Sequence, residues 1–204
     1  MLDFTIIGSG SKGNAVRIGG IMIDCGMPFA AMKEELYRCH SLLITHAHSD
    51  HVKAATLKQI RTQFPRIEIY ANPSVAYRFH VNHVIGTAPF ELRDGTEVRP
   101  FECVHDVETT GFMLHMNGED ILYATDTAEI NIPKGARFDW FFIESNYDEA
   151  KLREIAGKYR SGRYDPTDSQ YRHLSTQQAK AVYYTHRKSK DSQFIELHRS
   201  GRFY

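Results

Sequence analysis

The stretch LITHAHSDHVKA, residues Leu43–Ala54, places His46, His48, Asp50 and His51 within six consecutive positions. It follows an apolar run typical of a buried strand and precedes a segment with helical periodicity. A turn in that place directs several side chains into one small volume, and imidazole and carboxylate groups at a rigid strand end suit zinc, manganese or iron. A solvated loop that is rich in histidine by chance is the alternative, which this spacing disfavours. The stretch therefore predicts a metal site.

Further ligands are expected at the ends of later strands. One metal needs about four ligands, so four candidates packed this tightly suggest two metals that share partners. His105 follows the run EVRPFECV, Asp126 ends DILYATD, and His198 follows QFIEL, which brings the candidates to seven. His186, at the end of AVYYTH, is the alternative to His198. We favour His198, because a helix is expected to begin at Ser175, just after His173, and the span from His173 to His186 is too short for both that helix and a strand behind it.

The composition is that of a globular protein without excess charge. The chain has 204 residues, 42% of them apolar, and its 25 basic side chains balance 25 acidic ones. This balance argues against a generic nucleic-acid coat protein. The three cysteines form no C-x-x-C pair, so we expect reduced thiols and a cytoplasmic location. We also expect no signal peptide, no membrane-spanning segment and one domain over residues 1–204.

The hydrophobic pattern predicts strands in hairpin order over the first two thirds of the chain, with helices interspersed. The expected strands cover 3–8, 15–24 (a hairpin around Gly19-Gly20), 41–45, 67–71, 97–104, 110–116, 120–126, 139–145 and 193–197. The expected helices cover 29–37, 54–64, 148–159 and 175–188, with a loop at 161–171. Asn117-Gly118 predicts a tight turn. This order favours an α+β fold, with two packed sheets and helices outside them.

Several motifs resemble one known family. THAHSDH is similar to the T-H-x-H-x-D-H signature of the metallo-β-lactamase superfamily, and IDCG, HD and ATDT are similar to its other short motifs. Within the superfamily, nearly the whole chain resembles the YycJ-like branch of small bacterial and phage metallohydrolases. The motifs that carry this second resemblance are GSGSKGNA, VHD, ESNYD, HLS and HRS.

The resemblance implies a fold and a metal site. The fold would be the αβ/βα sandwich, two β-sheets flanked by helices, with the metals at one edge. Two divalent ions are implied, zinc first, with manganese or iron as alternatives. The implied ligand sets are His46, His48 and His105 for one ion, Asp50, His51 and His198 for the other, and Asp126 between them. Asp24 either holds a ligand histidine in one tautomer or caps a turn.

The resemblance also implies a hydrolase in which a metal-bridging hydroxide attacks phosphorus or a carbonyl carbon. Asp50 would both ligate and orient this nucleophile. In phosphodiesterase branches, a histidine in an HLS motif just before a helix contacts the scissile phosphate. His173 is therefore a catalytic and substrate-binding candidate, and Ser175 at the helix N-terminus a second substrate-binding candidate. An exposed loop histidine is the alternative for His173.

The predicted function is that of a phosphodiesterase that acts on nucleic acid or on a small or cyclic nucleotide. YycJ-like relatives are associated with nuclease activity on DNA. A carbonyl hydrolase acting on a lactone, thioester or lactam is the alternative, and a non-catalytic relic is a third possibility. A homo-oligomer is possible. The small-residue loop GSGSKGN, residues Gly8–Asn14, can pass close to the site, but a plain turn is the favoured interpretation of its glycines.

Overall fold

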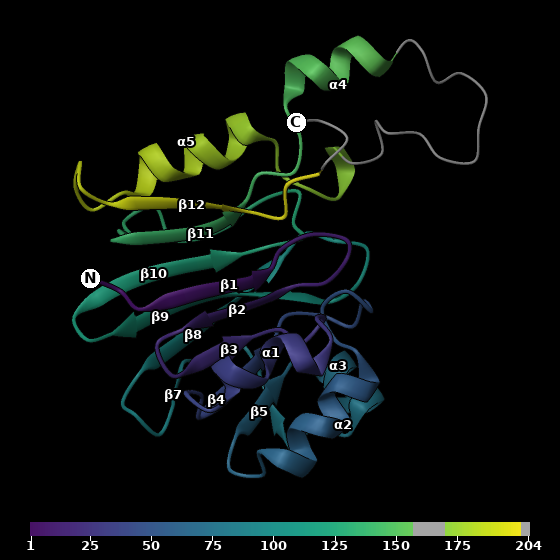
Figure 1. Ribbon diagram of the computed structural model, residues 1–204. Coiled ribbons are helices and arrows are strands. Elements are labelled where there is room, and N and C mark those ends of the chain that lie inside the picture. Colours follow the sequence, from purple (N-terminus) through teal and green to yellow (C-terminus); the bar gives the residue numbers. More distant parts are fainter. Residues whose placement is uncertain (157–169, 201–204) are drawn as a thin grey trace.

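Two six-stranded sheets form the centre of the part of the chain that the structure, a computed structural model, describes: residues 1–156 and 170–200 (Figure 1). The first sheet has the order β1 to β6. Its strands are β1 (Phe4–Gly8), β2 (Ala15–Ile18), β3 (Ile21–Ile23), β4 (Ser41–Ile44), β5 (Glu68–Ala71) and β6 (His83–Val84). Strands β1 to β3 pair antiparallel, whereas β3 to β6 pair parallel.

The second sheet has the order β12-β11-β10-β9-β8-β7. Its strands are β7 (Phe90–Glu91), β8 (Glu97–Cys103), β9 (Thr109–Met116), β10 (Glu119–Ala124), β11 (Trp140–Glu144) and β12 (Gln193–Leu197). Strands β7 to β10 pair antiparallel, and β10, β11 and β12 pair parallel. Both sheets are therefore mixed.

Five α-helices are described, and all of them except α4 lie beside a sheet. They are α1 (Phe29–Leu36), α2 (Ala54–Gln63), α3 (Pro73–Phe79), α4 (Glu149–Ala156) and α5 (Thr176–His186). Figure 1 shows α1, α2 and α3 beside the first sheet and α5 beside β11 and β12 of the second. Packing agrees with this view, because Met32 and Leu57 lie in one core cluster with Leu42, and Ala179 packs in another with Phe141.

The interior between the sheets is a third apolar cluster. The first sheet contributes Ile18, Ile23 and Leu43, and the second contributes Phe112 and Phe142, all fully buried. Buried apolar surface of this kind is the main favourable contribution to folding. The result is the α+β sandwich of two sheets flanked by helices that the sequence predicts.

The elements agree with the sequence pattern except for short ones. The Asn117-Gly118 turn is confirmed. Both residues have positive φ (52° and 79°), as the two central residues of a type I′ hairpin turn do. Helix α3 and the two-residue strands β6 and β7 were not predicted. Helix α4 is observed to Ala156. The rest of the predicted helix 148–159 and most of the loop 161–171 lie outside the described residues.

Within the described residues, no helix is both long enough and apolar enough to cross a lipid bilayer.

Candidate metal centre

A cluster of histidine and aspartate side chains, called the cluster below, lies where strands of both sheets end. Strands β10, β11 and β12 run parallel, and β8 runs in the same direction because two antiparallel steps through β9 separate it from β10. The residues that follow these strands therefore meet at one edge: His105 after β8, Asp126 after β10 and His198 after β12. In the first sheet, β3 and β4 are parallel, which brings Asp24 beside the loop that begins at Thr45.

All seven predicted ligands lie in this cluster. Potential ligand atoms of His46, His48 and His105 lie within 4.8 Å of one another, and so do those of Asp50, His51 and His198. Asp126 forms a further such group with His46 and His51. The two triads have the same membership as the sets that the sequence resemblance implies, and Asp126 lies between them.

Left-handed backbone conformations shape the edge. Among the described non-glycine residues, five have positive φ, and three of these follow strands at the cluster: Asp24 (64°), Asp126 (55°) and His198 (50°). Asp and His enter this region more readily than most residues, but the conformation still costs free energy. The surrounding packing maintains it, and the turn aims each side chain into the cluster.

Two buried nitrogens of the cluster have no hydrogen-bond partner among the described residues: Nε2 of His46 and Nε2 of His198. Buried polar atoms are rarely left in this state, so each requires an explanation. A cation that accepts their lone pairs supplies one, and imidazole with carboxylate is a donor set that zinc, manganese and iron accept. The residues present therefore fit a divalent metal centre.

The pKa directions of His46 and Asp126 agree with this fit. Burial, together with the neighbouring His51, lowers the pKa of His46 to about 2. Burial by itself would raise the pKa of Asp126, but the His198 and His51 rings hold this pKa well below its usual range. Near neutral pH, His46 is therefore neutral and Asp126 is ionised, which are the forms that bind a cation.

Asp24 supports the cluster from behind. Its carboxylate accepts hydrogen bonds from the Thr45 amide (2.8 Å), from the Thr45 hydroxyl and from Nδ1 of His51 (2.7 Å). A proton on Nδ1 leaves Nε2 of His51 as the lone-pair nitrogen, and that atom lies 2.9 Å from Oδ2 of Asp126. Both interpretations of Asp24 therefore hold: it fixes the chain turn at Thr45 and it orients a histidine of the cluster.

Asp24→Asn should weaken metal binding by about 10–100-fold, the usual effect of losing a carboxylate behind a ligand histidine. Asparagine tolerates the positive φ of position 24. Its amide nitrogen, however, must face one of the buried donors of Thr45 or His51. Titration against a competing chelator measures the dissociation constant. Asp191→Asn, at an exposed site, is the matched control and should bind metal as the wild type does; equal affinities of all three proteins would contradict the assignment.

His173 lies against the cluster and is held by a buried carboxylate. Its Nδ1 donates to Oε2 of Glu144 at 2.9 Å, and its ring stacks on that of His198 with centroids 5.3 Å apart. Potential ligand atoms of His173, Asp126 and His198 also lie within 4.8 Å of one another. Glu144 ends β11, is fully buried, and accepts further hydrogen bonds from the amides of Thr127 and Leu174.

Two other sequence candidates are placed differently. Ser175 is fully buried, and its hydroxyl caps α5 by accepting from the Gln178 amide and donating to Glu149. It is therefore not accessible to a substrate in this structure, which corrects its predicted role in substrate binding. His186, the alternative last ligand, ends α5, and its Nδ1 donates to the Ala136 carbonyl at 3.1 Å; it is in none of the groups that form the cluster.

Sequence reasoning missed several polar residues of the site. Asn14 places its amide nitrogen 2.8 Å from Nε2 of His51, and Asn146 places its own 3.1 Å from Nδ1 of His198. Asp106 lies 3.1 Å from Nε2 of His105. For Glu144 the available signal was a carboxylate that ends the otherwise apolar strand WFFIE, because a buried charge at a strand end needs a partner.

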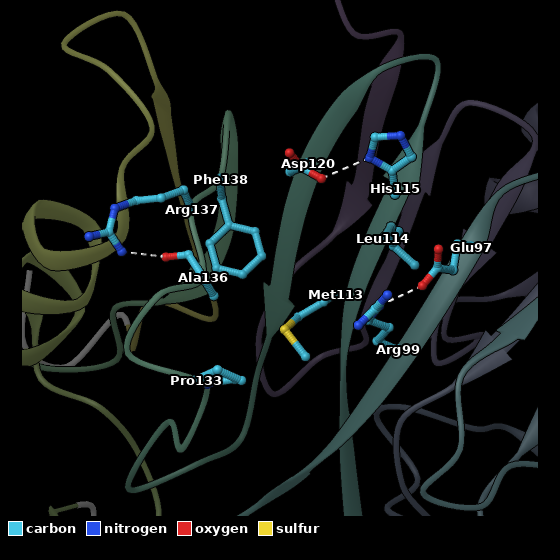
Figure 2. A pocket seen from close by; sticks show the side chains of 10 residues that line it. All are labelled: Glu97, Arg99, Met113, Leu114, His115, Asp120, Pro133, Ala136, Arg137 and Phe138. Carbon is cyan, nitrogen blue, oxygen red and sulfur yellow. Dashed lines mark hydrogen bonds and ion pairs between the residues drawn. The ribbon is translucent and has the colours of Figure 1, made fainter.

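A separate hollow lies at the opposite end of the second sheet. This cavity has a volume of about 520 Å³. Its lining residues, drawn in Figure 2, come from the start of β8, the end of β9, the start of β10 and the loop around Arg137. Its charged and titratable side chains already have partners: Arg99 pairs with Glu97, His115 with Asp120, and Arg137 donates to the carbonyls of Lys134 and Ala136. None of its lining residues belongs to the metal cluster.

Known proteins share this chain's sequence pattern and fold. Residues 21–187 match the beta-lactamase superfamily domain. The exodeoxyribonuclease YycJ of Bacillus anthracis is 29% identical over 187 residues, which cover 78% of this chain and 67% of that protein.

Solved structures with the same fold include three of low sequence identity. The metallo-β-lactamase fold protein YhfI of Bacillus subtilis has a TM-score of 0.72 at 14% identity, covering 98% of this chain and 86% of that one. The short form of human tRNase Z has a TM-score of 0.70 at 20% identity, with coverages of 98% and 93%. Zinc-bound PqqB of Methylobacterium extorquens has a TM-score of 0.67 at 14% identity, with coverages of 98% and 89%.

The matched domain spans most of the chain, the fold is shared, and the histidine and aspartate cluster lies at the sheet edge where the family resemblance expects it. The chain therefore belongs to the metallo-β-lactamase superfamily of metal-dependent hydrolases, within which it is similar to the YycJ-like branch.

Proposed function

We propose that the protein is a two-metal phosphodiesterase that hydrolyses nucleic acid. The observation that carries the proposal is the His173–Glu144 pair, held by a 2.9 Å hydrogen bond beside the cluster. Hydrolysis of a phosphodiester expels a poor alkoxide leaving group, which benefits from a proton donor. A carbonyl hydrolase that used the same cluster would have less need of this pair.

In the proposed site, His46, His48 and His105 would hold one ion, Asp50, His51 and His198 would hold the other, and Asp126 would be shared; the potential ligand atoms of each set lie within 4.8 Å of one another. Two divalent ions would supply Lewis acidity and hydroxide near neutral pH. Zinc is the first expectation, with manganese or iron as alternatives. The ligands come from both sheets, which supports the further proposal that residues 1–204 form one domain.

The protein's own groups would act around the reacting phosphorus. Asp50 orients the attacking oxygen. His173, with Nδ1 bound to Glu144, holds its second ring proton on Nε2 in the imidazolium form and gives that proton to the leaving oxygen. Glu144 fixes the direction of this proton and stabilises the positive charge of the ring. Asp24 keeps His51 in the tautomer that faces the cluster.

Two relatives support nucleic acid as the substrate. The similar protein from Bacillus anthracis is named an exodeoxyribonuclease, and the human protein of the same fold is named a tRNase. Both act on phosphodiester-linked polymers, as their names state. A small cyclic nucleotide is the alternative substrate within the same chemistry.

A substrate panel tests the proposal. The purified protein is incubated with zinc or manganese and with single-stranded DNA, double-stranded DNA, RNA, a cyclic nucleotide and a lactone. We expect hydrolysis of at least one phosphodiester, no hydrolysis of the lactone, and loss of activity on chelation. Turnover of the lactone alone would replace the proposal with the carbonyl hydrolase, and turnover of no substrate by a fully metal-loaded protein would contradict both.

A further inference from the structure

The loop Gly8–Asn14 is bonded to two residues of the cluster, His51 and His198, which belong to the same triad. Gly10 to Gly13 form a tight turn closed by a 2.9 Å hydrogen bond from the Gly13 amide to the Gly10 carbonyl. The Asn14 side chain accepts from the Gly10 amide at 2.7 Å and places its nitrogen 2.8 Å from Nε2 of His51. On the other side, Oγ of Ser9 accepts from the His198 amide at 2.6 Å. The loop is therefore fixed against the candidate ligands rather than being a detached turn.

A cavity of about 270 Å³ opens over this loop. Its lining consists of residues Gly8 to Gly13 with Met27 and Arg199. The charged side chains among these are both basic, Lys12 from the turn and Arg199 from the segment after β12, and both residues are exposed. A third basic group lies near, because Nζ of Lys53 is 3.5 Å from the Lys12 carbonyl. The carboxylate of Glu196 lies 3.5 Å from Nη1 of Arg199, on the side of β12, and it does not line the cavity.

The remaining lining favours an anion. Two serine hydroxyls can donate hydrogen bonds, and so can the Ser11 and Lys12 amides inside the turn, whereas the Gly10 and Gly13 amides already donate within the loop. Amides of this kind in a turn form concave anion sites. The glycines keep the backbone accessible: Gly10 and Gly13 have φ of 140° and 147°, which other residues rarely adopt. A Cβ at Gly13 would also collide with the Gly26 carbonyl. The loop is thus a shaped surface of donors and positive charge next to the cluster.

We propose that this cavity binds a phosphate group of the substrate next to the scissile one. The inference rests on the proposed phosphodiesterase function, since two residues of the cavity lining adjoin the metal centre: Ser9 accepts from the His198 amide, and Arg199 directly follows His198. Such a site would favour a polynucleotide over a cyclic mononucleotide as the substrate. The cyclic mononucleotide has a single phosphate, whereas an internal bond of a polynucleotide has a further phosphate on each side. Paired basic groups and backbone donors are the usual means of binding phosphate oxygens.

The double variant Lys12→Gln/Arg199→Gln tests this inference on a single-stranded oligodeoxynucleotide and on bis(4-nitrophenyl) phosphate, which carries one phosphate. We expect KM for the oligonucleotide to rise about tenfold or more, from the loss of two charged hydrogen bonds. The loss of kcat/KM on the oligonucleotide should exceed that on the small diester by about the same factor. In an anisotropy titration of a fluorescent oligonucleotide, the slope of log affinity against log salt should flatten by about one to two.

Controls separate this result from general damage. Lys58→Gln/Arg66→Gln removes the same charge from exposed positions outside the cavity and should leave KM, salt slope and metal content unchanged. Lys12→Gln alone leaves Arg199, the residue next to His198, unchanged. It should show about half of the double variant's change in the slope of log affinity against log salt.

The outcomes distinguish the ligand and the function. Oligonucleotides with and without a 5′-phosphate identify the bound group as terminal or internal, according to which of them the variant affects. Equal losses on both substrates, or an unchanged salt slope, would overturn the inference. If the wild type hydrolyses no phosphodiester, the proposed function fails, and the binding titration still decides whether the cavity holds phosphate.

Discussion

His173→Ala is expected to lower kcat for an oligonucleotide by about 10²–10⁴-fold while the protein keeps its metals. This is the range for removal of a general acid. The substitution deletes the ring whose Nδ1 is bound to Glu144 and whose plane stacks on His198. Because His173 is assigned to the leaving group, KM should change much less than kcat. Steady-state kinetics with metal analysis of the same preparation measure both effects.

The leaving group provides the decisive comparison. A 4-nitrophenolate leaves without protonation, so the same variant should lose far less activity on bis(4-nitrophenyl) phosphate than on the oligonucleotide. His186→Ala, which removes a histidine at the far end of α5, is the matched control and should match the wild type on both substrates. Equal losses on the two substrates would show that His173 supports the site structurally rather than donating a proton.

Glu144 can be tested through its partner. The Glu144 carboxylate accepts hydrogen bonds from Nδ1 of His173 and from the Thr127 and Leu174 amides. Glu144→Gln replaces one carboxylate oxygen with an NH₂ group, which cannot accept from any of these donors. If Glu144 is a positioning residue, its loss should be non-additive: the double variant with His173→Ala should be little slower than His173→Ala alone. Additive losses would assign Glu144 a role independent of His173.

Most of the fold could be predicted because its main strands carry clear signals. Runs such as IEIYA and WFFIE are short and apolar or alternating, and Asn117-Gly118 specifies a tight turn. The two-residue strands β6 and β7 are too short to leave a periodic pattern. Helix α3 is also short, although its start has a readable signal: Asn72 accepts from the Val75 amide, and Pro73 follows it.

The candidate site was predictable where its residues lie close together in the sequence or at strand ends. His46 to His51 form one compact motif, and His105, Asp126 and His198 each follow a strand. Residues that act through hydrogen bonds were not predictable in the same way, because a single Glu144 or Asn14 has many ordinary roles. The burial of Ser175 was also hidden, since a capping serine and a substrate-binding serine look alike before the packing around α5 is known.

Asp126→Asn is expected to have the largest effect, because Asp126 is the residue that we propose the two ions share, and it is grouped with His46 of one triad and His51 of the other. Its Oδ2 lies 2.9 Å from Nε2 of His51, and its Oδ1 lies 3.6 Å from Nε2 of His198. An amide has one oxygen and no negative charge, so it cannot neutralise and bridge two cations. Loss of a supporting carboxylate costs about 10–100-fold, so loss of a shared ligand should lower kcat/KM by at least about 10³-fold.

Metal content separates this expectation from the alternatives. The wild type should contain two divalent ions per chain and Asp126→Asn at most one, measured by elemental analysis, with circular dichroism to show that the fold is kept. Asp120→Asn, at the other end of the same strand β10, is the matched control and should retain both ions. A wild type with well under two ions would favour the non-catalytic relic. An Asp126→Asn variant with two ions and full turnover would mean that Asp126 is not the shared ligand.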